Sequence, residues 1–467
     1  MGPLWTARDA AAATAGSSIT DWAATGVSID TRSLTAGDLF VALRGPNHDS
    51  HDFVGIALGR GAAAAMVDRD IPGLSTVPLL RVADTFAGLA ALGSAARKRS
   101  NARIVAVTGS VGKTGTKEAL RLALAACGPT FASAGGLNNH WGVPLSLARM
   151  PPEAAYGVFE LGMNHSGEIG GLARLARPHV AVITTVEPAH LGFFPSVEAI
   201  ADAKAEIFLG LEAGGVAVLN RDNPHYTRLA AAAVQTGAAD VVSFGAHRAA
   251  TVRLLDCVLE SRSSMIEASL PGFTVRIRLP VAGRHWVINT LAVLAAVRAI
   301  GADPRRAAQA LTGLEELPGR GRRYELLWRS GRLTLIDESY NASPAAVCAA
   351  LAVLAAIPIA HGARRVAVLG DMLELGEATA RLHRELAEPL AAAKVERVFL
   401  VGTAVAALYD ALPESRRGGL WPTAGEGIPE LLRFLRAGDV IMVKGSRGIG
   451  LGPIVERLRA ESARPET

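Results

Sequence analysis

Short runs of β-branched apolar residues recur along this chain, and alanine-rich stretches of helical character separate them. Strand that alternates with helix builds βαβ units, whose strands run parallel and whose helices cover the sheet. The pattern therefore predicts an α/β fold with mostly parallel, twisted sheets. The runs span residues 104–108, 180–185, 216–219, 366–369, 398–401 and 440–443.

The length of 467 residues exceeds what one ordinary core supports, so we expect several domains. Three zones differ in their pattern of strand-like and helix-like segments. They are a small α/β zone at 1–100, a central zone at 101–317 and a final α/β zone at 318–467. Turn-forming residues at 317–321 mark the second boundary. Within the central zone, residues 252–279 alternate apolar and polar side chains, which predicts an antiparallel hairpin.

Composition and charge exclude several classes of protein. The formal net charge is only +5 and the basic residues are scattered, so a nucleic-acid-binding surface has no support. Three widely spaced cysteines make no disulfide framework. No segment reaches the roughly 18–20 apolar residues that span a bilayer. We therefore expect a cytoplasmic, monomeric protein that binds no nucleic acid and inserts into no membrane.

The strongest local motif is a β-run that breaks into a glycine-rich loop before an alanine- and leucine-rich helix. Its residues are Gly109, Ser110, Val111, Gly112, Lys113 and Thr114. Backbone N–H groups of such a loop surround phosphate oxygens, lysine adds a point charge, and threonine offers a hydroxyl to Mg²⁺. The full motif has glycine at the position of Val107, so this version is shortened. A plain glycine turn before a helix is the alternative.

Two further side chains follow strand-like runs. Glu160 ends the run at 157–160, and His190 comes shortly after the run at 183–186. The carboxyl ends of parallel strands form the ligand crevice of such a sheet, so both side chains are candidates to lie beside the phosphates and hold a metal ion. For His190 alone, an ordinary turn residue is the alternative.

Lysine is rare in this chain, with six lysines against 42 arginines. Arginine replaces lysine as a surface cation but not as a compact phosphate ligand or a reactive amine. Lys204, in a helix-like stretch at 200–208, is therefore a candidate functional amine. A solvated lysine that pairs with a neighbouring acid is the alternative.

These residues resemble the Mur ligase family over nearly the whole chain. Blocks at 337–344 and 369–376 are typical of the branch that adds D-alanyl-D-alanine, and the Asp-Asn-Pro-Arg motif of the diaminopimelate-adding branch is absent. The other matching segments are 30–33, 37–43, 49–53, 61–62, the phosphate loop, 138–139, 142–145, 160–164, His190, Lys204, 283–285, Asn289 and 443–447.

The resemblance implies three domains: a small α/β domain for the uridine nucleotide, a central phosphate-loop ATPase domain and a C-terminal Rossmann-like α/β domain. It implies an ATP-dependent ligase of peptidoglycan synthesis, which joins D-alanyl-D-alanine to UDP-N-acetylmuramoyl-tripeptide through an acyl phosphate and releases ADP and phosphate. The implied cofactors are ATP and Mg²⁺.

The resemblance also assigns roles to individual residues. Lys113, Glu160, His190 and Lys204 would be catalytic, and Mg²⁺ would be held by Thr114, Glu160, His190 and carbamylated Lys204. ATP would contact the six loop residues together with Asn289, Arg320, Asp337 and Asn341. The other substrates would contact Thr31, Arg32, Asp49, His51, Asn138, Asn139, Lys444, Ser446 and Arg447.

Four other classes of protein compete with this interpretation. A phosphoryl-transferring kinase could use the same loop but would release no phosphate. A nicotinamide dehydrogenase has less support, because no Gly-x-Gly-x-x-Gly follows a strand. A non-catalytic nucleotide-binding scaffold would not need Glu160, His190 and Lys204. Folylpolyglutamate synthetase shares the phosphate loop but not the motifs of the first zone.

Overall fold

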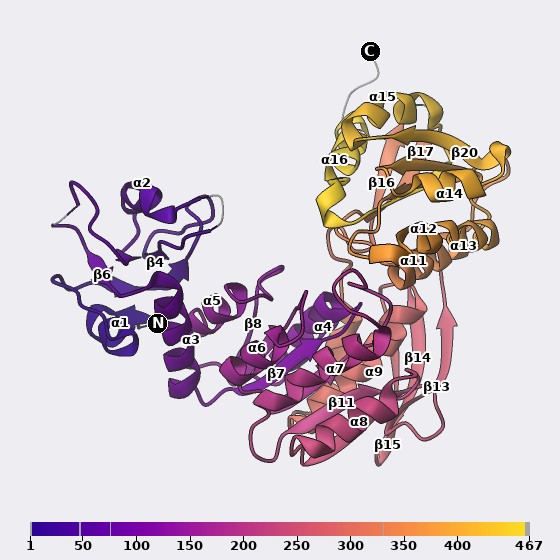
Figure 1. Ribbon diagram of the computed structural model, residues 1–467. Coiled ribbons are helices and arrows are strands. Elements are labelled where there is room, and N and C mark those ends of the chain that lie inside the picture. Colours follow the sequence, from indigo (N-terminus) through magenta and orange to yellow (C-terminus); the bar gives the residue numbers. More distant parts are fainter. Residues whose placement is uncertain (1, 46–47, 75, 330, 463–467) are drawn as a thin grey trace.

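The computed structural model describes residues 2–45, 48–74, 76–329 and 331–462, which fold into three α/β domains (Figure 1). The main sheet of each domain is mostly parallel, so the predicted fold class is confirmed. The central domain lies between the first and the third (Figure 1). Within these ranges, no helix is both long and apolar enough to cross a membrane.

The first domain has a parallel sheet of four described strands, in the order β3, β4, β5, β6. Alternate residues of β4 point into cores on opposite faces, Leu39 and Val41 on one side and Phe40 on the other. The elements are β1 (Trp5–Thr6), α1 (Ala7–Thr14), β2 (Ala23–Ala24), β3 (Gly26–Ser28), β4 (Asp38–Val41), α2 (Val54–Gly59), β5 (Ala64–Val67), β6 (Leu79–Arg81) and α3 (Thr85–Arg99).

The central domain has a nine-stranded sheet in the described chain, in the order β15, β14, β13, β12, β11, β10, β7, β9, β8. In this order, the strands from β13 to β8 all run parallel to one another. The strands are β7 (Arg103–Thr108), β8 (Thr130–Ala132), β9 (Tyr156–Glu160), β10 (Val180–Ile183), β11 (Val216–Asn220), β12 (Asp240–Gly245), β13 (Val252–Leu259), β14 (Ser264–Leu270) and β15 (Phe273–Leu279).

The antiparallel pairing predicted for residues 252–279 is confirmed, and it comprises three strands rather than two. β14 pairs antiparallel with both β13 and β15, while β13 runs parallel to β12 and so joins the meander to the main sheet. Alternating side chains of β14 and β15 are buried on one face only, as expected for a sheet with one solvated side.

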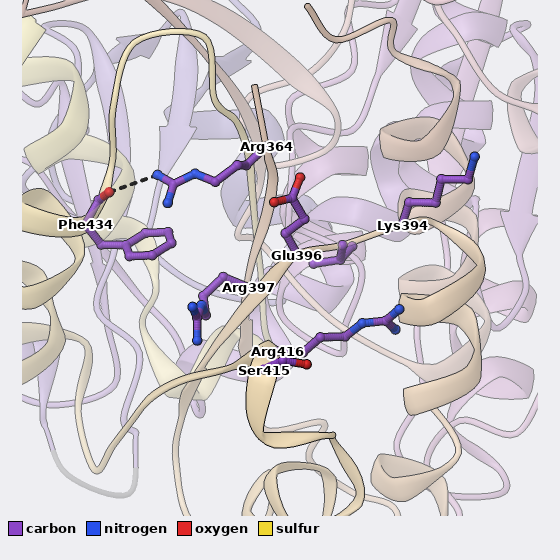
Figure 2. A pocket seen from close by; sticks show the side chains of 8 residues that line it. Arg364, Lys394, Glu396, Arg397, Ser415, Arg416 and Phe434 are labelled. Atoms are coloured by element: carbon purple, nitrogen blue, oxygen red, sulfur yellow. Dashed lines mark hydrogen bonds between the residues drawn. The ribbon is translucent and has the colours of Figure 1, made fainter. Parts of the chain in front are cut away.

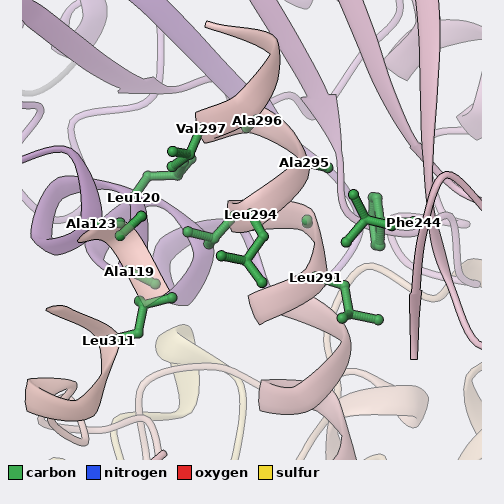
Figure 3. Packing of buried hydrophobic residues seen from close by; sticks show 14 of the residues in the cluster. Ala119, Leu120, Ala123, Phe244, Leu291, Leu294, Ala295, Ala296, Val297 and Leu311 are labelled. Carbon is green, nitrogen blue, oxygen red and sulfur yellow. The ribbon is translucent and has the colours of Figure 1, made fainter. Parts of the chain in front are cut away.

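Helices cover both faces of the central sheet, and two of them hold the phosphate loop in place. Leu120 and Ala123 of α4 pack with Leu294 and Val297 of α9 in one buried cluster (Figure 3). This packing fixes the first turn of α4 at the carboxyl edge of the sheet. The helices are α4 (Lys113–Ala125), α5 (Gly142–Ala148), α6 (Glu168–Ala176), α7 (Val197–Ala205), α8 (Tyr226–Gln235), α9 (Arg284–Ala299) and α10 (Pro304–Ala310).

The third domain has a sheet of six described strands in the order β16, β17, β21, β18, β19, β20, and only β16 is antiparallel to its neighbour. Its strands are β16 (Arg322–Trp328), β17 (Gly331–Glu338), β18 (Arg365–Gly370), β19 (Arg397–Val401), β20 (Arg417–Trp421) and β21 (Val440–Lys444). Its helices are α11 (Pro344–Ala356), α12 (Thr379–Arg384), α13 (Ala387–Ala392), α14 (Ala406–Ala411), α15 (Ala424–Phe434) and α16 (Gly452–Ser462).

A buried ion pair links the residues that directly precede two adjacent strands of this domain, β18 and β21. The Arg364 guanidinium donates from Nε and Nη2 to the two carboxylate oxygens of Asp439, at 3.0 and 2.6 Å. Arg364 Nη2 also donates to the carbonyl oxygen of Phe434 at 2.9 Å (Figure 2). The Asp439 side chain is fully buried. Its charge therefore depends on Arg364 for compensation.

We expect Arg364→Met to lower the free energy of unfolding by about 3–5 kcal/mol, because removing one partner of a buried pair leaves an uncompensated charge. Chemical denaturation followed by fluorescence of Trp328 and Trp421, which lie in the core of this domain, measures the loss. Arg436→Met is the matched control. The Arg436 guanidinium lies 3.9 Å from the same carboxylate but is 55% exposed, so its loss should cost below about 1 kcal/mol. Equal losses for the two variants would contradict the interpretation.

Candidate active site

The phosphate loop lies between β7 and α4 and is packed tightly on both sides. Gly109 and Gly112 have φ angles of +147° and +85°, which side chains rarely adopt. A Cβ atom at Gly109 would lie 1.9 Å from Thr184 Oγ1, and one at Gly112 would lie 3.0 Å from Asn289 Oδ1. Lys113 Nζ donates to the carbonyl oxygen of Gly109 at 2.7 Å, which holds the ammonium over the loop.

Glu160 ends β9, the strand next to β7, and its carboxylate reaches the first turn of α4. Oε2 accepts a hydrogen bond from Thr114 Oγ1 at 2.8 Å, and Oε1 accepts one from Asn138 Nδ2 at 2.8 Å. The side chain is only 4% exposed. The structure therefore places a buried, oriented carboxylate directly beside the phosphate loop.

Lys204 lies on α7 and is only 2% exposed. In the described part of the chain, its ammonium forms no hydrogen bond or ion pair. Burial, reinforced by the nearby charge of Lys113, holds the pKa of Lys204 well below its usual range. Burial therefore disfavours the charged ammonium relative to the neutral amine, which is the nucleophilic form.

His190 contacts the third domain rather than Glu160 or Lys204. Its Nδ1 lies 2.5 Å from Glu374 Oε2, and the hydrogen bond lowers the pKa of the Glu374 carboxyl. The described residues contain no group of three or more His, Cys, Asp or Glu side chains that could hold a metal ion. Of the four expected metal ligands, Thr114 and Glu160 are in direct contact, while Lys204 could add an oxygen only after modification.

Residues at the junction of the second and third domains approach the loop from the other side. Burial lowers the pKa of Lys113, and the charges of Glu160 and Arg320 also act on it, in opposite directions. The Arg320 guanidinium stacks over the ring of Tyr340 at 4.1 Å, and that of Arg447 lies 5.6 Å from the same ring. Cation–π contacts of this kind stabilise the positions of both guanidinium groups.

Other predicted residues of the third domain form an internal network. The buried carboxylate of Asp337 accepts from the amides of Gly319 and Ser339, at 2.9 and 3.1 Å. Lys444 Nζ donates to Glu338 Oε2 at 2.8 Å and to the carbonyl oxygen of Asn341 at 3.1 Å. The network orders the carboxyl ends of β17 and β21, which face the central domain.

The first-domain candidates lie in the loops that follow β3 and β4, away from the phosphate loop. Arg32 pairs with Asp30, and the carbonyl oxygen of Thr31 accepts from Arg60. Asp49 Oδ1 accepts from the backbone amide of His51 at 3.0 Å. In the central domain, Asn139 accepts from the amide of Gly142 and so caps the turn into α5.

No role for Lys117 follows from the sequence motifs. Its fully buried ammonium donates to the carbonyl oxygen of Ser133 at 2.6 Å and pairs with Glu118 at 2.7 Å. Ser133 Oγ in turn accepts from the amide of Glu160 at 3.3 Å. Lysine is scarce in this chain, and this scarcity is the sequence signal that could have indicated a role for Lys117. Lys98 and Lys394, by contrast, are exposed.

Comparisons with known proteins agree with this geometry. Residues 107–297 match the Mur ligase middle domain, and residues 322–447 match the Mur ligase glutamate ligase domain. The chain is 36% identical over 436 residues to UDP-N-acetylmuramoyl-tripeptide–D-alanyl-D-alanine ligase of Escherichia coli (strain K12), which covers 93% of both proteins.

Solved structures are similar over all three domains. MurF from Acinetobacter baumannii superposes with a TM-score of 0.84 at 30% identity and covers 98% of this chain and 99% of that one. MurF ligase from Thermotoga maritima, solved in complex with ADP, gives a TM-score of 0.76 at 26% identity and covers 93% of this chain and 97% of that one.

The packing of Gly109 yields a test of the loop. We expect Gly109→Ala to weaken nucleotide binding about tenfold to a hundredfold, because the added Cβ meets Thr184 and the φ angle is strained by about 1–3 kcal/mol. Isothermal titration with ADP measures the affinity. Gly171→Ala is the control, since a Cβ there has no atom within 4 Å. An unchanged affinity in Gly109→Ala would show that the loop does not bind the nucleotide.

Proposed function

The chain belongs to the Mur ligase family, and from this premise we propose that it joins D-alanyl-D-alanine to UDP-N-acetylmuramoyl-tripeptide at the expense of ATP. The observation that carries the proposal is the similarity to UDP-N-acetylmuramoyl-tripeptide–D-alanyl-D-alanine ligases along most of the chain. The Escherichia coli relative is 36% identical, and the match covers 93% of both chains. The contact of Glu160 with Thr114 beside the phosphate loop adds support from geometry.

The proposed reaction has two steps. A carboxylate oxygen of the tripeptide attacks the γ-phosphorus of ATP, the bond to the β-phosphate oxygen breaks, and ADP leaves. The amine of D-alanyl-D-alanine then attacks the acyl carbon of the acyl phosphate, phosphate leaves, and the nitrogen loses a proton to give the amide. Both steps bring anions together, so positioning and charge compensation supply most of the catalysis.

The chain offers the groups that this chemistry needs. Backbone amides of the loop and the N-terminus of α4 would face the phosphates, and the side chain of Lys113, which is held over the loop, would provide a cation. Asn289, beside Gly112, together with Arg320, Asp337 and Asn341 at the domain junction, would bind the rest of the nucleotide. Arg320 acts on the charge of Lys113, which supports its place near the phosphates.

We propose that Thr114, Glu160, His190 and a carbamylated Lys204 hold Mg²⁺. Bound there, the ion would neutralise charge that develops on the transferred phosphoryl group. Oxygen donors suit Mg²⁺, and burial favours over the ammonium the neutral amine of Lys204, which is the form that adds to CO₂ and releases a proton. The carbamate would give an anionic oxygen where arginine could not.

The division into domains at 1–100, 101–317 and 318–467 is part of the proposal. The first domain would bind the uridine nucleotide through the loops that carry Thr31, Arg32, Asp49 and His51. The peptide substrates would contact the remaining candidates, from the loop beside Glu160 and from the third domain. These are Asn138, Asn139, Lys444, Ser446 and Arg447.

We expect release of phosphate from ATP to require both UDP-N-acetylmuramoyl-tripeptide and D-alanyl-D-alanine. A coupled phosphate assay with each substrate omitted in turn measures this requirement. A kinase would form a phosphorylated product without the dipeptide and release no phosphate. Equal turnover with a folate and glutamate would instead assign the chain to folylpolyglutamate synthesis.

We expect Lys204→Arg and Lys204→Ala to lose activity by at least about a hundredfold, because neither side chain forms a carbamate ligand. Short-chain carboxylates such as acetate should restore part of the activity of Lys204→Ala, since they fit the space left, but none of that of Lys204→Arg. Lys394→Ala, at an exposed lysine, is the control and should keep full activity. Near-normal turnover of Lys204→Arg would exclude carbamylation.

A further inference from the structure

Two loops from different domains meet at His190. The loop after β10 carries His190 and Gly192, and the loop after β18 carries Glu374. His190 Nδ1 lies 2.5 Å from Glu374 Oε2, and the amide of Gly192 donates to the carbonyl oxygen of Glu374 at 2.8 Å. Both a side-chain and a backbone hydrogen bond therefore cross the domain boundary at this point.

The backbone of both residues is bent into an unusual shape to make this contact. His190 has a φ angle of +61° and Glu374 one of +66°, the left-handed region that residues other than glycine seldom occupy. Such conformations are energetically unfavourable and persist where the surroundings impose them. The two strained residues are each other's partners, so the strain is concentrated in the contact itself.

Close approach of the two backbones leaves no space between the loops. A Cβ atom on Gly376 would lie 3.0 Å from Gly192 Cα, which is tighter than most real Cβ contacts. Leu191 packs against the hydrophobic cores of both the central and the third domain. The contact is therefore a packed junction and not a lone surface ion pair.

The third-domain side of the junction is rigid. Asp371 accepts from the amide of Val405 at 2.8 Å, the amide of Met372 donates to the buried His383 ring at 2.9 Å, and the amide of Leu373 donates to Ser446 Oγ at 2.9 Å. The three residues that precede Glu374 are thus held by three separate segments. Their hold fixes the position of the Glu374 carboxylate.

We propose that Glu374 is a positioning residue that orients His190 for the divalent cation and makes cation binding depend on docking of the third domain. A carboxylate at Nδ1 accepts the ring proton there, so the lone pair stands on Nε2, which is the atom left for a metal ion. His190 then has its productive tautomer and orientation only while the third domain is docked. The inference rests on the proposed role of His190 in the metal site.

The test compares Glu374→Ala with Glu377→Ala. Glu377 lies three residues further along the same segment, is exposed, and forms no side-chain hydrogen bond or ion pair with any described residue. Binding of Mn²⁺ in the presence of ADP is titrated by electron paramagnetic resonance, and small-angle X-ray scattering reports the separation of the domains. Neither measurement needs the tripeptide or the dipeptide, so failure of the proposed function and failure of this inference are distinguishable.

We expect Glu374→Ala to weaken Mn²⁺ binding about tenfold to a hundredfold and to increase the radius of gyration, while Glu377→Ala changes neither. Glu374→Gln should recover part of the affinity, since its amide oxygen still accepts from Nδ1. Gly376→Ala should reproduce the effects of Glu374→Ala by separating the loops with the carboxylate intact. An affinity of Glu374→Ala within twofold of the original protein, or a loss of affinity with unchanged scattering, would overturn the proposal.

Discussion

Strand β7 pairs in parallel with β9 on one side and with β10 on the other, and this pairing decides which groups can reach the phosphate loop. Val107 lies opposite Glu160 in the first pair, and Thr108 lies opposite Ile183 in the second. The loop that leaves β7 therefore emerges between a buried carboxylate and the segment that carries Thr184. The contact of Thr114 with Glu160 and the tight fit of Gly109 both follow from this register.

Two lysine amines and the buried carboxylate of Glu160 lie around that loop. Lys113 and Lys204 place two amines in one buried region, and the charge of Lys113 contributes to the lowered pKa of Lys204. Repulsion between like charges grows as water is excluded, so such an arrangement is most stable when an anion is present. A triphosphate and a carbamate are anions of that kind. The network of Lys117, Ser133 and Glu160 shows the contrasting case, a buried lysine whose partners are built into the chain.

Much of the fold could be predicted because its determinants are local. The β-branched run at 104–108, the glycines that follow and the helix after them lie within a few residues of one another, and periodicity reveals them. The carboxyl ends of parallel strands then place Glu160 beside the loop. The junction of His190 with Glu374 could not be predicted in this way, because it joins residues 184 positions apart in different domains. The strained φ angles of both residues leave no trace in composition or periodicity.

Because lysine is scarce, the surface of the molecule carries few lysine side chains. Lys117, Lys204 and Lys444 are buried, and Lys113 is held by the phosphate loop, so Lys98 and Lys394 are the exposed lysines of the chain. The first lies in the last turn of α3, in the first domain, and the second lies between α13 and β19, in the third domain. Amine-selective dyes attached to these two side chains would form a donor–acceptor pair. Energy transfer between them would follow the distance from the first domain to the third without any engineered attachment site.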